Sequence, residues 1–226
     1  MGRLATGVMT VPSRLRLLGD RGDAYRVLAI GAHPDDIEIG CAATLMRLID
    51  ESAIAAIRWV VLTGTPERAA EAHASAVALT GDVPLEASVE AFEDGYLPWA
   101  GADVKLSLEG HKAFKPDLIF THRLEDAHQD HRLVAELAWQ IFRDALICEY
   151  EIPKYEGDLG HPNLFVTVTR DLAQRKIDHV QQAFPSQLGR QWFSADSFQA
   201  LLRLRGIEAN SPTGLAEAFT CRKLVI

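Results

Sequence analysis

Residues 26–36 read Arg-Val-Leu-Ala-Ile-Gly-Ala-His-Pro-Asp-Asp. The apolar first half, which lacks polar alternation, is typical of a strand buried on both faces of a sheet. The proline and two aspartates that follow suit the first turn of a helix. In an open α/β sheet, side chains at such a junction face the crevice where ligands bind. His33 and Asp36 are three residues apart and would share one face of a helical turn, whereas Asp35 would point elsewhere.

A second polar cluster has the same relation to a buried strand. Residues 117–122 read Asp-Leu-Ile-Phe-Thr-His, and a polar loop then leads to His128, Asp130 and His131. His128 and His131 are again three residues apart, so the two pairs would converge if the two strands are neighbours. Two imidazoles, a carboxylate and a water make an open catalytic Zn²⁺ site, and such ligands do not exclude Fe²⁺, Mn²⁺ or Co²⁺.

Strand and helix patterns alternate along the chain, which predicts a Rossmann-like α/β fold with a mostly parallel sheet flanked by helices. We interpret residues 1–226 as one domain, with an N-terminal arm over 1–24 and a C-terminal extension from about residue 150 to 226 that borders the site. The expected strands are 26–32, 57–63, 87–92, 117–122, 145–149, 164–169 and an edge strand at 222–226. The expected helices are 37–50, 67–80, 103–114, 130–144, 171–182 and 195–205.

The composition is that of a folded protein with an acidic balance of charge. Of the 226 residues 48% are hydrophobic, which is enough to fill a core, and the formal net charge is −8. This balance argues against non-specific binding to nucleic acids, which requires a basic surface. The three cysteines are expected to be free thiols, and no apolar run reaches membrane-spanning length. We therefore expect a cytoplasmic protein, and a homo-oligomer is compatible with the sequence.

Together the two motifs resemble the signature motifs of the LmbE-like, or PIG-L-like, N-deacetylases. His-Pro-Asp-Asp at residues 33–36 is similar to the first motif, and His-Gln-Asp-His at residues 128–131 is similar to the second. The resemblance covers residues from about 25 to 135. Gln129 stands where the family usually has proline, and Ile37 where it often has glutamate. Neither departure removes a ligand.

The resemblance implies a role for each polar side chain of the two motifs. It implies a zinc site formed by His33, Asp36 and His131. It implies that Asp35 is the general base, and that His128 stabilises the oxyanion or helps to protonate the leaving amine.

Several neighbouring residues complete the predicted site. Asp130 is expected to take part in catalysis by binding a ring nitrogen of a neighbouring histidine and fixing its tautomer, and Asp126 is a candidate for the same role toward His128. By resemblance, Arg68 in the pattern Arg-Ala-Ala-Glu would contact the substrate, and the alternative is an ordinary ion pair between Arg68 and Glu71. Asp94 is a second candidate for binding sugar hydroxyls.

For three features the sequence leaves the interpretation open. Tyr96 and Trp99 either pack in the core or border a sugar pocket. His122 and His161 fall on the expected side of the site, but the sequence assigns neither of them a role. The loop at residues 150–162 follows a predicted strand and either lines or covers the site.

We therefore expect a zinc-dependent N-deacetylase. Its substrate would be a small N-acetylated molecule that contains N-acetylglucosamine, such as a sugar conjugate or a lipid head group, or another N-acylated small molecule. One alternative is an amidase that removes a larger acyl group from a thiol conjugate or natural product. Another is a non-catalytic nucleotide-binding module, against which the sequence Gly31-Ala32-His33 argues, because it lacks the glycine-rich phosphate cradle.

Overall fold

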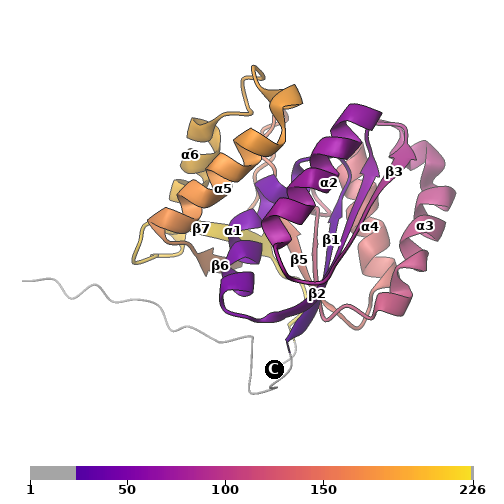
Figure 1. Cartoon of the computed structure of the whole chain (residues 1–226), viewed down its shortest axis with the longest axis horizontal. Coiled ribbons are helices and arrows are strands. Elements are labelled where there is room, and N and C mark those ends of the chain that lie inside the picture. The colour runs from indigo at the N-terminus through magenta and orange to yellow at the C-terminus, as the bar shows by residue number, and fades with distance from the viewer. Residues whose placement is uncertain (1–23, 225–226) are drawn as a thin grey trace, which may run out of the picture.

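The computed structural model describes residues 24–224 of the chain. The predicted N-terminal arm therefore lies outside the described residues, apart from residue 24. Within the described part, one sheet of seven strands is flanked by six α-helices (Figure 1). The predicted fold class, an α/β fold with a mostly parallel sheet, is confirmed.

The strands follow the order β3-β2-β1-β4-β5-β7-β6 across the sheet. The four pairings from β3 to β5 are parallel, whereas β7 runs antiparallel to both β5 and β6. The strands are β1 Tyr25–Gly31, β2 Ile54–Thr63, β3 Leu85–Phe92, β4 Leu118–Thr121, β5 Leu146–Tyr150, β6 Leu164–Thr167 and β7 Ala216–Thr220. Strands β6 and β7, which follow residue 150, therefore belong to the same sheet as β1, the strand that leads into the first motif.

The helices cover the two faces of the sheet unequally. Figure 1 shows α1, α2, α5 and α6 on one side of the sheet and α3 and α4 on the other. The helices are α1 Asp36–Asp50, α2 Pro66–Thr80, α3 Gly101–Gly110, α4 Gln129–Ile141, α5 Arg170–Ala183 and α6 Ala195–Glu208. Three short 3₁₀ turns also occur in the described residues: η1 Leu97–Ala100 before α3, η2 Lys112–Phe114 after α3, and η3 Pro185–Gln187 between α5 and α6.

Strand β1 contributes side chains to two hydrophobic cores, one on each face of the sheet. Val27 and Ala29 belong to the core under α1, α2, α5 and α6, whereas Leu28 and Ile30 belong to the core under α3 and α4. All four side chains are fully buried. Because both faces are covered, the strand has no polar alternation, and this is why its sequence is continuously apolar.

The predicted edge strand at residues 222–226 is wrong. The last strand is β7, which ends at Thr220 and lies between β5 and β6, and residues 222–224 form no strand. Residues 225 and 226 lie outside the described part of the chain. The sequence of β7 does not read as a buried strand, because its second residue, Glu217, is charged although it is buried. The carboxylate of Glu217 accepts hydrogen bonds from the backbone N–H groups of Ala43 and Thr44 in α1, at 3.1 and 2.7 Å.

Two further sequence expectations can be compared with the described residues. None of the helices within residues 24–224 is long and apolar enough to cross a lipid bilayer. The three cysteines of the chain are all free thiols, as predicted.

Candidate metal centre

The two polar motifs meet at one edge of the sheet. β1 and β4 are adjacent and parallel, so the residues that follow them emerge side by side. The first motif forms the turn between β1 and α1, and the second forms the end of the loop between β4 and α4 and the start of that helix. The two pairs of side chains therefore converge, as predicted for the case in which the two strands are neighbours.

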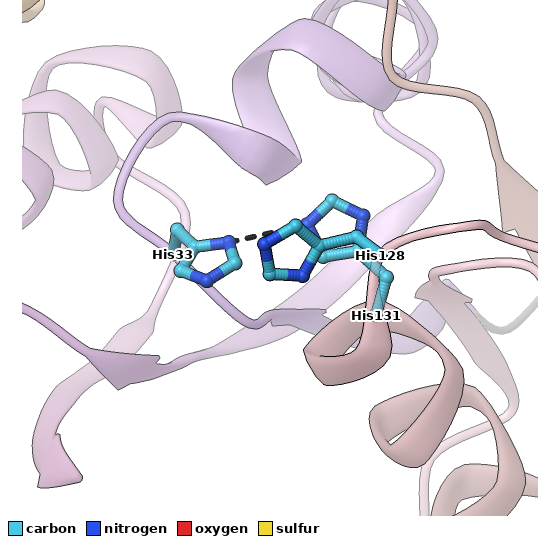
Figure 2. A group of neighbouring side chains, drawn as sticks. All are labelled: His33, His128 and His131. Atoms are coloured by element: carbon cyan, nitrogen blue, oxygen red, sulfur yellow. Dashed lines mark hydrogen bonds between the residues drawn. The ribbon is translucent and has the colours of Figure 1, made fainter. Parts of the chain in front are cut away.

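Three atoms from the two motifs surround a common point. His33 Nδ1 lies 3.1 Å from His131 Nε2 and 3.3 Å from Asp36 Oδ2, and His131 Nε2 lies 3.6 Å from Asp36 Oδ2. Ligands about 2.1 Å from a tetrahedral zinc ion are about 3.4 Å from one another, so these separations suit one shared cation. Figure 2 shows the rings of His33 and His131 pointing toward each other, with His128 beside them.

Carboxylates hold the second ring nitrogen of each of these histidines. His33 Nε2 lies 3.2 Å from Asp130 Oδ2 and 3.0 Å from Asp94 Oδ1. His131 Nδ1 lies 3.1 Å from Asp126 Oδ2. A carboxylate behind a histidine keeps the proton on that nitrogen and leaves the other nitrogen free for a metal. Asp130 thus contacts a histidine ring as expected.

The prediction that Asp126 binds a ring nitrogen of His128 is wrong. Its Oδ2 faces the ring of His131, whereas its Oδ1 accepts a hydrogen bond from the backbone N–H of His128 at 2.8 Å. The ring of His128 is held differently, because its Nδ1 accepts a hydrogen bond from the backbone N–H of Asp130 at 3.2 Å and so caps α4. The proton of a neutral His128 is therefore on Nε2.

The pKa values of the cluster follow from burial and from its many carboxylates. Burial, together with the neighbouring charge of His122, lowers the pKa of His131 to about 4, so its ring is neutral near pH 7, as a metal ligand must be. Burial also lowers the pKa of His33, but hydrogen bonds to Asp130, Asp36 and Asp94 outweigh it and hold the pKa well above its usual range. The cluster has more carboxylates than cationic groups, which suits a divalent cation.

Asp35 occupies a backbone conformation that few residues adopt. Its φ angle is 93°, in the left-handed region, and it directly precedes α1. A non-glycine residue in this region is strained, and such strain is concentrated at functional sites. Asp35 is buried, and its Oδ2 lies 3.0 Å from the guanidinium of Arg68 without accepting an aligned hydrogen bond. Burial raises the pKa of Asp35 well above its usual range, and the charge of Arg68 offsets part of this rise.

Arg68 faces the first motif and not Glu71. Its guanidinium donates a hydrogen bond to the carbonyl of Pro34, next to the contact with Asp35. The side chain of Thr65 caps α2 and accepts a hydrogen bond from the backbone N–H of Arg68, at 3.3 Å. Glu71 instead accepts hydrogen bonds from the backbone N–H and the hydroxyl of Ser186. The alternative interpretation of a surface ion pair is therefore wrong, and a contact between Arg68 and substrate stays a prediction.

His122 belongs to the cluster, although the sequence assigned it no role. Its ring is fully buried and stacks on the ring of His131, with centroids 3.8 Å apart. Its Nε2 accepts a hydrogen bond from the backbone N–H of Ala32 at 2.9 Å and lies 3.2 Å from Asp36 Oδ2. The position of His122 directly after β4 was the sequence signal that could have assigned it to the site. His161, the other open candidate, is exposed.

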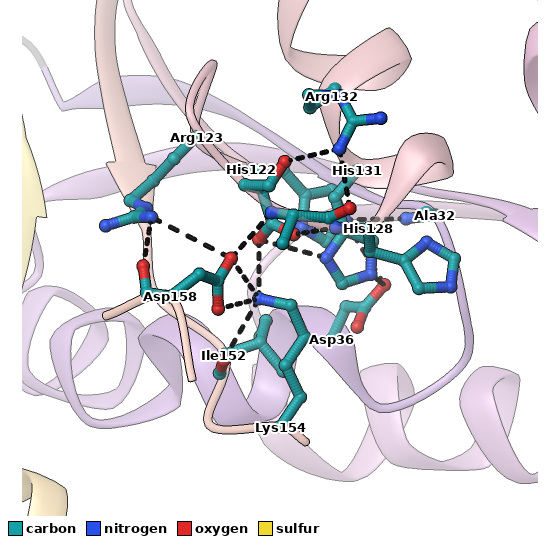
Figure 3. Close-up of polar contacts among 12 residues, drawn as sticks. Ala32, Asp36, His122, Arg123, His128, His131, Arg132, Ile152, Lys154 and Asp158 are labelled. Atoms are coloured by element: carbon teal, nitrogen blue, oxygen red, sulfur yellow. Dashed lines mark hydrogen bonds and ion pairs between the residues drawn. The ribbon is translucent and has the colours of Figure 1, made fainter. Parts of the chain in front are cut away.

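The loop after β5 contacts the second motif. Lys154 Nζ lies 3.0 Å from Asp126 Oδ2 and donates hydrogen bonds to both oxygens of Asp158, at 2.7 and 2.8 Å (Figure 3). Asp158 Oδ2 also accepts a hydrogen bond from the backbone N–H of Ala127 at 2.7 Å. The loop at residues 150–162 therefore supports the site from behind the carboxylate that faces His131. Nothing in the sequence around Lys154 signals this contact.

Comparison with known proteins assigns the chain to a family. Residues 28–142, just over half of the chain, match the family profile described as PIG-L: GlcNAc-PI de-N-acetylase. A curated relative from Escherichia coli K12, named as an uncharacterized deacetylase YaiS, is 51% identical over 49 residues. That match covers 21% of this chain and 25% of the relative, so it spans about a quarter of the relative's length.

Solved structures share the fold at low sequence identity. The N,N'-diacetylchitobiose deacetylase from Pyrococcus horikoshii is 21% identical with a TM-score of 0.67, and the match covers 88% of this chain and 84% of that one. GalB, a 4-carboxy-2-hydroxymuconate hydratase from Pseudomonas putida KT2440, is 16% identical with a TM-score of 0.69, over 89% and 98% of the two chains. At these identities the likeness shows the fold alone.

Proposed function

Because the chain belongs to the PIG-L family, we propose that it is a metal-dependent N-deacetylase that hydrolyses the N-acetyl amide of a small molecule. The observation that carries the proposal is the approach of His33 Nδ1, Asp36 Oδ2 and His131 Nε2 to one point, in a site whose first turn also contains the buried Asp35. Ligands for a cation and a candidate base are thereby combined at the edge of the sheet where α/β proteins bind their substrates.

Zinc is the metal that we propose for this site. His33, Asp36 and His131 would hold it, and their imidazole and carboxylate donors also suit Fe²⁺, Mn²⁺ or Co²⁺. When bound, Zn²⁺ supplies a water of lowered pKa and polarises the amide carbonyl.

Asp35 is the proposed general base. Its Oδ2 is buried and accepts no aligned hydrogen bond, so it has a free lone pair with which to take a proton from the attacking water. The guanidinium of Arg68 lies 3.0 Å from this same oxygen and holds the carboxylate by its charge. After attack, the protonated Asp35 can return the proton to the nitrogen of the departing amine.

His128 is proposed to act on the carbonyl oxygen or on the leaving amine. Because its Nδ1 accepts the hydrogen bond from Asp130, its Nε2 carries the proton that can be donated. A donor at this position stabilises the negative charge that develops on the carbonyl oxygen. Asp130 would assist catalysis by orienting both this ring and that of His33.

The proposed substrate is an N-acetylated sugar derivative or another N-acylated small molecule. A chitobiose deacetylase among the structural neighbours supports a sugar, although the hydratase neighbour shows that the fold alone does not set the reaction. Removal of a larger acyl group is the second candidate within this class. A cytoplasmic location, the absence of a nucleic-acid partner and the oligomeric state stay predictions.

The test is metal analysis of the purified protein followed by an assay for free amine. We expect stoichiometric metal and release of amine from N-acetylglucosamine conjugates. His131→Ala should lose both, because one of the three ligands is removed. A metal-free protein that binds nucleotide and releases no amine from any N-acylated probe would contradict the proposal.

A further inference from the structure

Two of the three free cysteines lie on neighbouring antiparallel strands. Cys148 is the third residue of β5, and Cys221 directly follows the last residue of β7. The register of the two strands pairs Glu149 with Thr220. Because the two chains run in opposite directions, the next position along the pair places Cys148 opposite Cys221. The third cysteine, Cys41, lies in α1.

The backbone of Cys221 is oriented away from β5. Its N–H donates to the side-chain oxygen of Asn163 at 2.8 Å, and its carbonyl accepts from the side-chain nitrogen of the same residue at 3.0 Å. Asn163 directly precedes β6, which lies on the other side of β7. Cys148 and Cys221 therefore occupy a non-hydrogen-bonded position of the ladder. The Cα atoms at such a position are about 4.5 Å apart, within the range of about 4.4–6.8 Å that disulfides require.

The two cysteine side chains belong to the same face of the sheet. Cys148 is part of the hydrophobic core under α1, α2, α5 and α6, and so is Phe219, two residues before Cys221. Successive side chains of a strand point to opposite faces, so Glu149 is on the other face. Arg222 follows Cys221 and its Nε donates to Glu149 Oε1 at 2.6 Å. The alternation thus continues past the end of β7 and places Cys221 on the face of Cys148.

The two thiols differ in their access to solvent. Cys148 is 3% exposed, whereas Cys221 is partly exposed. Burial raises the pKa of Cys148, and the neighbouring charge of Cys221 raises it further, as expected for two thiols that lie close together. Burial also raises the pKa of Cys221. Because the thiolate is the reactive form, oxidation should be slow and should begin at Cys221, which solvent can reach.

We propose that Cys148 and Cys221 form a redox modification site, which a peroxide oxidises to a disulfide that joins β5 to β7. Hydrogen peroxide first converts the thiol of Cys221 to a sulfenic acid and is itself reduced to one water. The sulfur of Cys148 then attacks the sulfur of Cys221. The S–S bond forms, and the sulfenic oxygen leaves with the thiol proton as a second water. A thiol reductant reverses the reaction by exchange.

Peptide mapping under non-reducing conditions tests the site directly. After treatment of the full chain with hydrogen peroxide, we expect a cross-linked pair of peptides that contains Cys148 and Cys221 and has lost two hydrogen atoms. Dithiothreitol should reverse the cross-link, and Cys221→Ser should abolish it. The matched control is Cys41→Ala, which removes a buried thiol from α1 and should leave the cross-link unchanged.

The melting temperature gives a second measurement. A disulfide that closes a long loop restricts the unfolded chain, so oxidation should raise the Tm of the wild type by about 5–10 °C and should not raise that of Cys221→Ser. A cross-link that involves Cys41, a cross-link only between two copies of the chain, or a sulfinic acid at Cys221 with Cys148 unmodified would overturn the proposal. These measurements need neither bound metal nor turnover, so they do not depend on the proposed deacetylase function.

Discussion

The two motifs of the metal centre supply similar side chains but hold them by different means. The first motif is closed by a hydrogen bond within its own turn, in which the backbone N–H of His33 donates to Asp36 Oδ2 at 2.7 Å. The second depends on distant parts of the chain, because Asp126, which faces His131, is itself contacted by Lys154. A short strained turn suits the reacting group, whereas a supported loop suits a ligand whose orientation must be set from behind.

The largest effect should come from the base in the first motif. Asp35→Asn should lower kcat by roughly 10²–10⁴-fold, because an amide cannot accept the proton, while the metal content should not change. Amine release and metal analysis of the same preparation would measure both. Asp103→Asn, an exposed change in α3, is the control. Full turnover in Asp35→Asn would show that Asp35 is not the base.

The support of the second motif can be broken at Asp126. Asp126→Asn should lower the affinity for zinc by about 10–100-fold, because His131 loses the carboxylate that orients its ring. Competition with a chelator would measure the affinity without any assay of turnover. The exposed Asp82→Asn is the matched control. An unchanged affinity would mean that the turn of α4 alone orients His131.

Arg68 tests whether the first motif depends on a neighbouring helix. If Arg68 positions Asp35, then Arg68→Met should lower kcat by up to about a hundredfold and change KM much less. If Arg68 binds the substrate, as the family resemblance implies, KM should rise and kcat should be retained. Steady-state kinetics on one N-acetylated substrate separates these outcomes.

The smallest effect is expected at Lys154, which reaches His131 only through Asp126. Lys154→Met should weaken zinc binding by about fivefold at most, as for other partly exposed ion pairs. Because it acts through Asp126, it should add nothing in the double variant with Asp126→Asn. Lys105→Met, on the exposed surface of α3, controls for the loss of charge. An additive loss in the double variant would show that Lys154 acts on the site by another route.

Some predicted elements extend differently in the structure because their ends depend on packing. The helix expected at residues 103–114 is divided into α3 and the short turn η2, with a residue of left-handed backbone, Lys115, directly after it. The strand expected at residues 222–226 has an apolar run only over its last three residues, 224–226, and the strand that completes the sheet is β7. A buried Glu217 is tolerated there because two backbone N–H groups of α1 and the ammonium of Lys176 surround its carboxylate. Such partners are invisible in a local pattern.

The sequence by itself determined the α/β fold, the two strand-end motifs and the family, because apolar runs and motif spacings are local properties of the chain. Only the tertiary structure decided which groups face one another: Lys154 with Asp126, Arg68 with Asp35, and His122 between Ala32 and Asp36. These partners are brought together by the order of the strands and the paths of the loops. Local spacing cannot specify a contact between residues that are dozens of positions apart, because that contact depends on the packing of whole elements.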